Sequence, residues 1–477
     1  MIESALFTDF YELTMAQGYW KRGKNTPAVF DMFFRRQPFN GGFSVFAGLD
    51  PLLETIENFR FSAEDIEYLS SLDMFDPDFL DWLAAFRFTG DIFAMNEGTI
   101  VFPNEPLLRV SANIIEASII EGLVLNMINF QSLIATKTAR IWLAANKAPL
   151  MEFGLRRAQG NDGAMSASRA AYIGGASGTS NTLAGKLYGI PVMGTMAHSW
   201  IMSFPNEQEA FDAYAERYPQ KSVFLIDTYN TLESGLPAAI KAGKKLMEKG
   251  YNFGVRLDSG DLQYLTQEVR NVLDRAGLQA ATITVSNELT EEIVESLVLN
   301  KAPIDSWGVG THMVTGGNEA SFTGVYKLAS RTRPDGTAVP VMKLSDNPDK
   351  TTNPGVKQVW RLYHNDGSVK ADVLALEGDE IKTGTERTYF HPSNDWQNFP
   401  FAAAKVQPLL SKKMEAGKRT GTPESLTDIR SRVQSGLDEL DRSYKRILNP
   451  HVFKVSLTEE LKDLKVALMK GRLEHLD

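Results

Sequence analysis

The middle of the chain repeats one pattern, in which short apolar runs alternate with longer stretches of helical periodicity. The runs are apolar throughout rather than alternating, which is typical of strands covered on both faces. Stretches such as 235–249 and 262–276, with the 3.6-residue period of a helix, lie between them. Strands and helices alternating at this spacing predict βαβ units and a parallel sheet. The runs are 150–155, 190–195, 223–228, 253–257, 281–286 and 306–311.

Both flanks of this region carry a different pattern. Short strand signals, split by Gly, Asn and Pro turns, occur in the first part of the chain and again after the last apolar run. We therefore predict that 1–125 and 324–400 pack into one discontinuous α/β side domain. Residues 126–323 are predicted to form an irregular α/β barrel domain. Beyond this the pattern becomes helical and charged, so 401–477 are predicted as a helical C-terminal extension.

Most of the predicted strands end in polar residues or glycine. Because the carboxyl ends of parallel strands meet at one face, these residues suggest a single ringed site, as in an α/β barrel. The alternative is that Asp227 and Ser286 cap the helices that follow. That alternative does not explain the arginines Arg156, Arg157 and Arg256. No GxGxxG motif follows the first run, which disfavours a dinucleotide-binding domain.

Composition narrows the class of protein. The 477 residues carry a net charge of −9, which argues against a nucleic-acid partner because phosphate backbones demand a basic face. The absence of cysteine excludes disulfides and thiolate nucleophiles and fits a reducing compartment. The first nine residues lack a basic leader, and no apolar run approaches the roughly 18 residues that span a bilayer. We therefore expect a cytoplasmic protein without a membrane partner.

Six short motifs stand in a fixed order along most of the chain. They are TDFYELTM at 8–15, EFGLRRA at 152–158, GTSN at 178–181, GTMAHS at 194–199, RLDSGD at 256–261 and GVGT at 308–311. Together they resemble the nicotinate phosphoribosyltransferase family. The resemblance implies a type II phosphoribosyltransferase fold and a homodimer with shared active sites. It also implies a reaction that joins nicotinate to 5-phosphoribosyl 1-diphosphate (PRPP), coupled to ATP hydrolysis, giving nicotinate mononucleotide and diphosphate for NAD synthesis.

The resemblance also assigns substrate-binding residues. It places Arg256 beside the nicotinate carboxylate and Arg156 near the pyridine and the PRPP phosphates, and the planar guanidinium suits both kinds of anion. Phe153 and Tyr11 would sandwich the pyridine ring, with Tyr11 contributed by the neighbouring subunit. The backbone and hydroxyl donors of Gly308, Gly310 and Thr311 would hold a PRPP phosphate.

The remaining assignments concern specificity and the energy source. Ser180 stands where nicotinamide-using relatives carry an aspartate, which favours the acid substrate, and Thr195 would face nicotinate. His198 matches the histidine that ATP phosphorylates during turnover, and an imidazole nitrogen is a competent nucleophile near neutral pH. Asp258 and Asp227 are candidates for magnesium-bound water or the ribose hydroxyls. Mg²⁺ is expected because it neutralises the leaving diphosphate, although no residue is assigned as a direct metal ligand.

Structural interpretations of the same residues remain open. His198 could be a hydrogen-bonded structural residue, Arg256 could form a salt bridge to Asp258 or Asp261, and Phe153 could be ordinary core. Rival functions are a nicotinamide or quinolinate phosphoribosyltransferase of the same fold, or a non-catalytic metabolite-binding relative. A metal-dependent barrel hydrolase would need clustered histidines, and an aldolase would need a strand-end lysine. The six strand ends show neither feature.

Overall fold

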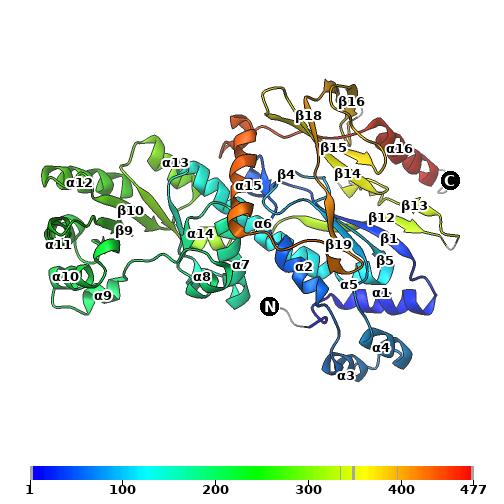
Figure 1. Ribbon diagram of the computed structural model, residues 1–477, viewed down its shortest axis with the longest axis horizontal. Coiled ribbons are helices and arrows are strands. Elements are labelled where there is room, and N and C mark those ends of the chain that lie inside the picture. The colour runs from blue at the N-terminus through cyan, green and yellow to red at the C-terminus, as the bar shows by residue number, and fades with distance from the viewer. Residues whose placement is uncertain (1–3, 334, 346–349, 395, 474–477) are drawn as a thin grey trace. The chain divides into compact units, whose positions relative to one another are not determined.

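The computed structural model describes residues 4–333, 335–345, 350–394 and 396–473 (Figure 1). The chain folds as two compact units, which are described separately. The flanking unit comprises 1–133 and 321–477, and the central unit comprises 134–320.

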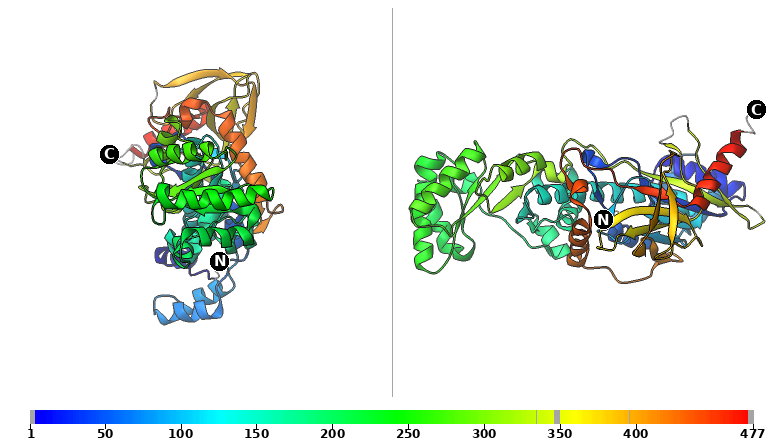
Figure 2. Two further views of the ribbon diagram at one scale, coloured as in Figure 1. Left: turned by 90° about the vertical axis from the view of Figure 1, so that its left-hand side faces the viewer. Right: turned by 90° about the horizontal axis from the view of Figure 1, so that it is seen from above.

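The central unit contains a six-stranded sheet whose strands are all parallel, in the order β7-β6-β11-β10-β9-β8. Most of its apolar strand residues are buried, as the continuous apolar runs predict, and helices surround the strands (Figure 2). The α/β class predicted from the alternation is confirmed. The strands are β6 (Leu150–Glu152), β7 (Gly178–Thr179), β8 (Val223–Leu225), β9 (Gly254–Leu257), β10 (Thr282–Asn287) and β11 (Ser306–Val309).

One predicted strand is corrected. The run 190–195 forms only an isolated bridge between Val192 and Thr179 instead of a regular strand. Pro191 has no N–H to donate to a ladder, which limits regular pairing at this point.

The hydrogen-bonded strand order is open among the residues that the structure describes, from β7 at one edge to β8 at the other. The segment after the Val192 bridge links the two edges through side chains. It reaches β8 and β9 by contacts of His198 with Thr228 and of Arg256 with Thr195. Closure into a barrel stays a prediction.

The helices of the central unit follow the strands as expected of βα units. Several begin at a polar side chain that accepts a backbone N–H: Asn181, Asn206, Asp261 and Thr290 do so for α8, α10, α12 and α13. The helices are α7 (Gly160–Ile173), α8 (Thr182–Tyr188), α9 (His198–Met202), α10 (Glu207–Arg217), α11 (Leu236–Glu248), α12 (Leu262–Arg275), α13 (Glu291–Leu299) and α14 (Thr311–Val314).

The flanking unit contains two larger sheets, and the first of them joins both ends of the chain. The first has the order β13-β12-β1-β5-β3-β19-β20, so strands from before and after the central unit pair directly. Its strands are β1 (Pro27–Phe34), β3 (Asp91–Ala94), β5 (Leu108–Asn113), β12 (Gly324–Thr332), β13 (Ala338–Pro340), β19 (Ser411–Glu415) and β20 (Lys418–Arg419). A small sheet pairs β2 (Ser44–Val45) with β4 (Ile100–Val101).

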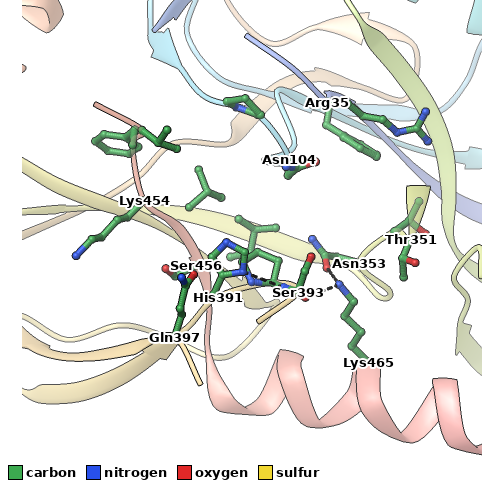
Figure 3. A pocket seen from close by; sticks show the side chains of 18 of the residues that line it. Arg35, Asn104, Thr351, Asn353, His391, Ser393, Gln397, Lys454, Ser456 and Lys465 are labelled. Carbon is green, nitrogen blue, oxygen red and sulfur yellow. Dashed lines mark hydrogen bonds between the residues drawn. The ribbon is translucent and has the colours of Figure 1, made fainter. Parts of the chain in front are cut away.

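The second sheet of the flanking unit has the order β17-β16-β21-β15-β14-β18 and borders a cavity (Figure 3). Its strands are β14 (Lys357–Tyr363), β15 (Val369–Leu376), β16 (Glu386–Phe390), β17 (Asn398–Ala402), β18 (Lys405–Pro408) and β21 (Val455–Leu457). The helices of this unit are α1 (Phe10–Lys21), α2 (Leu49–Glu57), α3 (Ala63–Ser71), α4 (Pro77–Ala84), α5 (Ile114–Ile119), α6 (Glu121–Ala144, which runs on into the central unit), α15 (Leu426–Glu439) and α16 (Glu459–Leu473).

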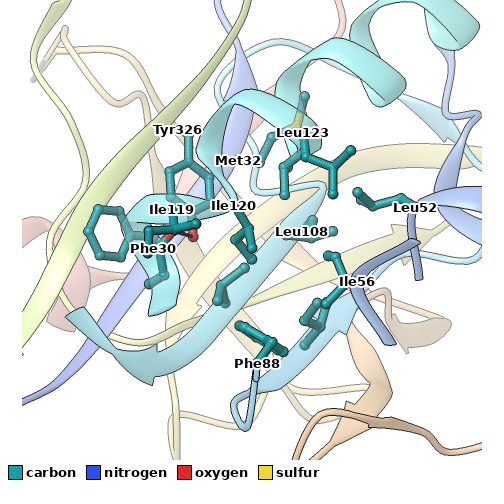
Figure 4. Packing of buried hydrophobic residues seen from close by; sticks show 14 of the residues in the cluster. Phe30, Met32, Leu52, Ile56, Phe88, Leu108, Ile119, Ile120, Leu123 and Tyr326 are labelled. Atoms are coloured by element: carbon teal, nitrogen blue, oxygen red, sulfur yellow. Dashed lines mark hydrogen bonds between the residues drawn. The ribbon is translucent and has the colours of Figure 1, made fainter. Parts of the chain in front are cut away.

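A hydrophobic core between the first sheet and helices α1, α2, α5 and α6 stabilises the flanking unit (Figure 4). Phe30 on β1 stacks on Tyr326 of β12 with ring centroids 4.9 Å apart. The Tyr326 hydroxyl donates to the carbonyl of Ala117, which satisfies the polar atom of a buried ring. The two ends of the chain therefore share one core.

The segment beyond 401 is more mixed than predicted. The expected helices are present as α15 and α16, but residues 405–419 form β18, β19 and β20, and 455–457 form β21. A turn at Ala416 and Gly417, both with positive φ, joins β19 to β20. Charged side chains in β18, β19 and β20 interrupt the apolar pattern that predicts a strand.

Residues 114–144, which form α5 and α6, are long and apolar enough to cross a membrane by length and composition alone. The sequence-based expectation missed this stretch because charged residues interrupt it. Most of the stretch is buried within the protein, as in the core helix of a globular fold.

Candidate active site

Two aspartates join the ends of neighbouring strands in the central unit. The backbone N–H of Asp258, after β9, donates to Oδ2 of Asp227, after β8, over 2.9 Å. The Ser286 hydroxyl, on β10, donates to Asp258 Oδ1. Asp227 and Ser286 therefore both bind the end of β9 instead of capping helices, whereas Asp261 does cap α12. The alternative interpretation, that Asp227 and Ser286 cap the following helices, is therefore wrong.

Asp227 keeps one oxygen for another partner. Its Oδ2 also accepts from the Ser259 hydroxyl over 2.6 Å. Its Oδ1 is buried and has no hydrogen-bond partner within the described part of the chain. A buried carboxylate oxygen without a donor is costly, which is typical of a site that a ligand completes.

His198 begins α9 and lies beside these aspartates. Its Nδ1 is 3.1 Å from the Thr228 hydroxyl, and its Nε2 is 3.9 Å from Asp258 Oδ2. The side chain is 41% exposed. One ring nitrogen is therefore held in place while the ring stays open to a reactant.

Arg256 on β9 binds the segment that precedes His198. It donates to the Thr195 hydroxyl and, over 3.2 Å, to the carbonyl of Met196. Both partners are neutral, so the predicted alternative of a salt bridge to Asp258 or Asp261 does not describe its hydrogen bonds. Its Nε is buried and has no partner among the described residues. The guanidinium therefore retains donor capacity for an anion.

Burial lowers the pKa of Arg256 below its usual range, while the nearby carboxylates Asp258 and Asp227 raise it and the charge of Arg156 lowers it. The guanidinium stays protonated at neutral pH because arginine ordinarily loses its proton only in strongly alkaline solution. Arg156, whose charge contributes to this lowering, is an exposed residue in the turn after β6.

Phe153 packs directly on the glycine motif. A Cβ at Gly308 would lie 2.6 Å from the Phe153 ring, and one at Gly310 would lie 3.1 Å from the Phe153 carbonyl oxygen. The backbone N–H of Phe153 donates to Val309 over 2.8 Å. The ring is half-buried, unlike a core phenylalanine. Glycine at 308 is required by this close approach.

Thr311 begins the short helix α14 and donates to Oε1 of Glu288 over 3.1 Å. Oε2 of the same carboxylate is 3.4 Å from Nε2 of His312. Glu288 follows Asn287, whose φ of 131° is unusual for a residue other than glycine. Sequence reasoning missed Glu288, although its position just after β10 was a usable signal.

Two further residues were missed because their partners are distant in sequence. Glu152 is fully buried at the end of β6 and accepts from the N–H of Gly154 and from the hydroxyls of Ser168 and Thr179. The Tyr214 hydroxyl donates to the carbonyl of Thr195 over 3.3 Å. Both support segments that carry predicted site residues. A lone acid ending an apolar run was the signal for Glu152.

The predicted residues fall into two sets. Ser180 is half-buried after β7, and its N–H donates to the Glu152 carbonyl over 2.9 Å, so it belongs with Phe153 in the central unit. Tyr11 lies on α1 of the flanking unit and is 49% exposed. Burial, together with Glu121 and Glu12, raises the pKa of Tyr11, so its hydroxyl stays protonated. Its pairing with Phe153 across two subunits stays a prediction.

No group of three or more His, Asp or Glu side chains that could hold a metal ion occurs in the part of the chain that the structure describes. The aspartate pair Asp227 and Asp258 offers free oxygen atoms without forming a cage.

Three protein-family models match the chain. Residues 6–129 match the nicotinate phosphoribosyltransferase N-terminal domain, 148–371 match the nicotinate phosphoribosyltransferase family, and 356–465 match the corresponding C-terminal domain. The chain belongs to the nicotinate phosphoribosyltransferase family.

Relatives match over almost their whole length. The nicotinate phosphoribosyltransferase of Bacillus subtilis is 40% identical over 479 residues, covering 98% of this chain and 96% of the relative. The human protein of the same name is 34% identical, covering 98% and 97%. The crystal structure of human nicotinic acid phosphoribosyltransferase superposes with a TM-score of 0.86 at 33% identity, covering 97% of this chain and 99% of that chain.

Proposed function

We propose that this chain joins nicotinate to PRPP and releases nicotinate mononucleotide and diphosphate. A bond forms between the pyridine nitrogen and C1 of the ribose, and the bond between C1 and the diphosphate oxygen breaks. One observation carries the proposal. Arg256 donates to the Thr195 hydroxyl, and its Nε is left without a hydrogen-bond partner among the described residues. Nearby, Oδ1 of Asp227 also lacks a partner among those residues. The names of the matched relatives support it.

Nicotinate would bind between a cation and an aromatic ring. The Arg256 guanidinium would take the carboxylate, and Arg156 would add positive charge. The half-buried Phe153 ring, fixed against Gly308, would cover one pyridine face. Tyr11 of a second copy would cover the other, so we propose a homodimer with shared sites. Ser180, which carries no charge, would leave the nicotinate carboxylate unopposed.

Positioning and charge stabilisation would carry the transfer step. Asp227 and Asp258 would face the ribose, where positive charge develops at C1 as the diphosphate leaves. The backbone N–H groups of Gly308 and Gly310 and the Thr311 hydroxyl would hold a phosphate. Thr311 would first have to exchange its bond to Glu288.

A magnesium ion bound to the diphosphate would neutralise its charge as it leaves. The donor set fits such an ion only loosely, because Asp227 and Asp258 supply oxygen atoms but no third acidic or imidazole ligand joins them among the described residues. The ion would therefore keep mostly phosphate and water ligands, as Mg²⁺ commonly does.

We further propose that His198 accepts the γ-phosphoryl group of ATP, releasing ADP, and that water later cleaves the phosphohistidine to phosphate. Nε2 is the nucleophile, because Nδ1 is engaged with the Thr228 hydroxyl. The 41% exposure of the ring leaves room for the nucleotide. The chain has no cysteine, which supports work in the reducing cytoplasm.

Product analysis tests the proposal. Purified protein is incubated with PRPP and nicotinate, nicotinamide or quinolinate, with and without ATP. We expect nicotinate mononucleotide from nicotinate alone, with more product when ATP is present. Equal conversion of nicotinamide would favour the nicotinamide enzyme, and carbon dioxide release from quinolinate would favour the quinolinate enzyme. If no nucleotide formed from nicotinate, nicotinamide or quinolinate, the result would favour a non-catalytic metabolite-binding relative.

A further inference from the structure

A cavity of about 940 Å³ lies in the flanking unit, and none of the residues assigned to the proposed active site lines it. It is bordered by the end of β1, the turn around 351–353, the residues after β16, the segment 451–456 and helix α16 (Figure 3). Its volume is within the range of small-molecule sites.

Lys465 on α16 contributes a buried ammonium group to the cavity. It is 8% exposed and donates to Asn353 Oδ1 and to the Pro392 carbonyl, both over 3.0 Å. Both partners are neutral, and an ammonium has a third hydrogen to donate. Burial lowers the pKa of Lys465 to about 8, so the group is still mostly charged at neutral pH. A buried charge with neutral partners is costly, and an anion would offset that cost.

Three other donors lie around the same cavity, and Figure 3 shows them with Lys465. Nδ1 of His391 accepts the N–H groups of Ser393 and Asn394, both over 3.1 Å, so the proton of the neutral ring is on Nε2. Asn353 accepts through its oxygen, which leaves its NH₂ as a donor. Nε of Arg35 is buried and lacks a hydrogen-bond partner within the described residues.

Negative charge is scarce in this cavity. Among its described lining residues, Asp31 is the single acid, and its Oδ2 lies 2.8 Å from Nζ of Lys357. That pair is neutral as a whole, and Arg35, Lys454 and Lys465 add positive charge to the lining. Part of the wall is apolar and aromatic, formed by Phe33, Pro106, Leu374, Phe399 and Phe453.

We propose that this cavity binds a phosphomonoester attached to a planar ring, the class of a nucleoside monophosphate. The phosphate would lie at Lys465, His391 and Asn353, and the ring would lie against the apolar wall. A tetrahedral phosphate accepts from more directions than a carboxylate and therefore better suits the three donors of Lys465, His391 and Asn353. This second site is independent of the proposed transfer reaction.

Calorimetric titration of the full-length protein with adenosine 5′-monophosphate tests the proposal, in the presence of saturating PRPP, which fills the proposed active site and has no planar ring. We expect one binding event per chain. Inorganic phosphate and adenosine, the two parts of the probe, should each bind at least tenfold more weakly.

Two variants locate the binding. Lys465→Met removes the ammonium, and His391→Asn keeps an acceptor for the two backbone N–H groups but removes the Nε2 donor. Each should weaken binding at least tenfold, whereas Lys470→Met, which removes an exposed lysine of the same helix, should leave it unchanged.

The outcomes separate cleanly. Absence of binding at millimolar probe, or unchanged affinity in either folded variant, would overturn the proposal. If inorganic phosphate bound as tightly as adenosine 5′-monophosphate, the proposal that the cavity also binds a planar ring would be wrong. If thermal melting shows that Lys465→Met does not fold, His391→Asn decides. These experiments measure binding and not turnover. Their outcome therefore stays interpretable even if the product analysis shows that the proposed transfer reaction is wrong.

Discussion

Nε2 of His198 lies 3.9 Å from Oδ2 of Asp258, while the Ser286 hydroxyl binds the other oxygen of that carboxylate. The imidazole is thus connected to the ends of β9 and β10 through one side chain. A carboxylate at this position stabilises a positively charged ring and would orient it during phosphoryl transfer. This relationship makes His198 the first residue to test.

We predict that His198→Ala abolishes the ATP stimulation of nucleotide formation and leaves the fold intact, because a partly exposed ring is removed. The measurement is initial rate with and without ATP, together with labelling by γ-³²P ATP. His364→Ala, which removes a histidine of the flanking unit, is the matched control. Retention of full ATP stimulation in His198→Ala would rule out the phosphohistidine role.

Arg256→Lys should raise the KM for nicotinate by about tenfold or more, which corresponds to roughly 1.5–3 kcal/mol for a lost charge-assisted bond. A lysine ammonium cannot bind Thr195, Met196 and a carboxylate in the planar geometry of the guanidinium. Steady-state kinetics against nicotinate measures the effect. The control is Arg275→Lys, at the exposed end of α12, which should leave the KM for nicotinate unchanged. An unchanged KM in Arg256→Lys would show that Arg256 does not bind nicotinate.

The parallel sheet was predictable because its strands are continuous apolar runs, and the residues Asp227, Asp258 and Ser286 were found because they end those runs. Their mutual hydrogen bonds, with 28 and 31 residues between partners, could not be read from local pattern. The same holds for Tyr214, whose contact with Thr195 depends on how α10 packs. Glu288 was missed because a polar residue after a strand is usually a solvated loop.

The fold of the flanks was harder to predict for a physical reason. Strands β12 and β1 pair although about 290 residues separate them, so their register depends on the tertiary fold. Strands β18 to β20 carry several charged side chains, which weakens the alternation that marks a strand. At Pro191 the sequence misled in the opposite direction. The apolar run 190–195 predicted a strand, but it forms only a single bridge.

Gly308→Ala should impair nicotinate binding, because the new methyl would lie 2.6 Å from the Phe153 ring and force it to move. Overpacking of this kind costs about 1–3 kcal/mol of stability. Kinetics and thermal melting measure the two effects, with Gly163→Ala as control. Position 163 lies in α7 with open space around its Cβ. Substituting Gly308 without any effect on the KM for nicotinate would contradict a binding role for the Phe153 ring.

Glu12 predicts a pH dependence of stability. The side chain is 1% exposed, and burial, followed by repulsion from Glu121, raises the pKa of its carboxyl from about 4.5 to about 7. Between pH 4.5 and about 7, the Glu12 carboxyl of the folded protein holds a proton that the same carboxyl of the unfolded chain has released. The free energy of unfolding therefore falls as pH rises from about 4.5 to 7, by roughly 3 kcal/mol, and is constant above that window for this group. Glu12→Gln should flatten the decline in thermal melting between pH 5 and 8, whereas Glu67→Gln, at an exposed site on α3, should retain it. Identical melting profiles for wild type and Glu12→Gln would show that the Glu12 carboxyl ionises near its ordinary pKa.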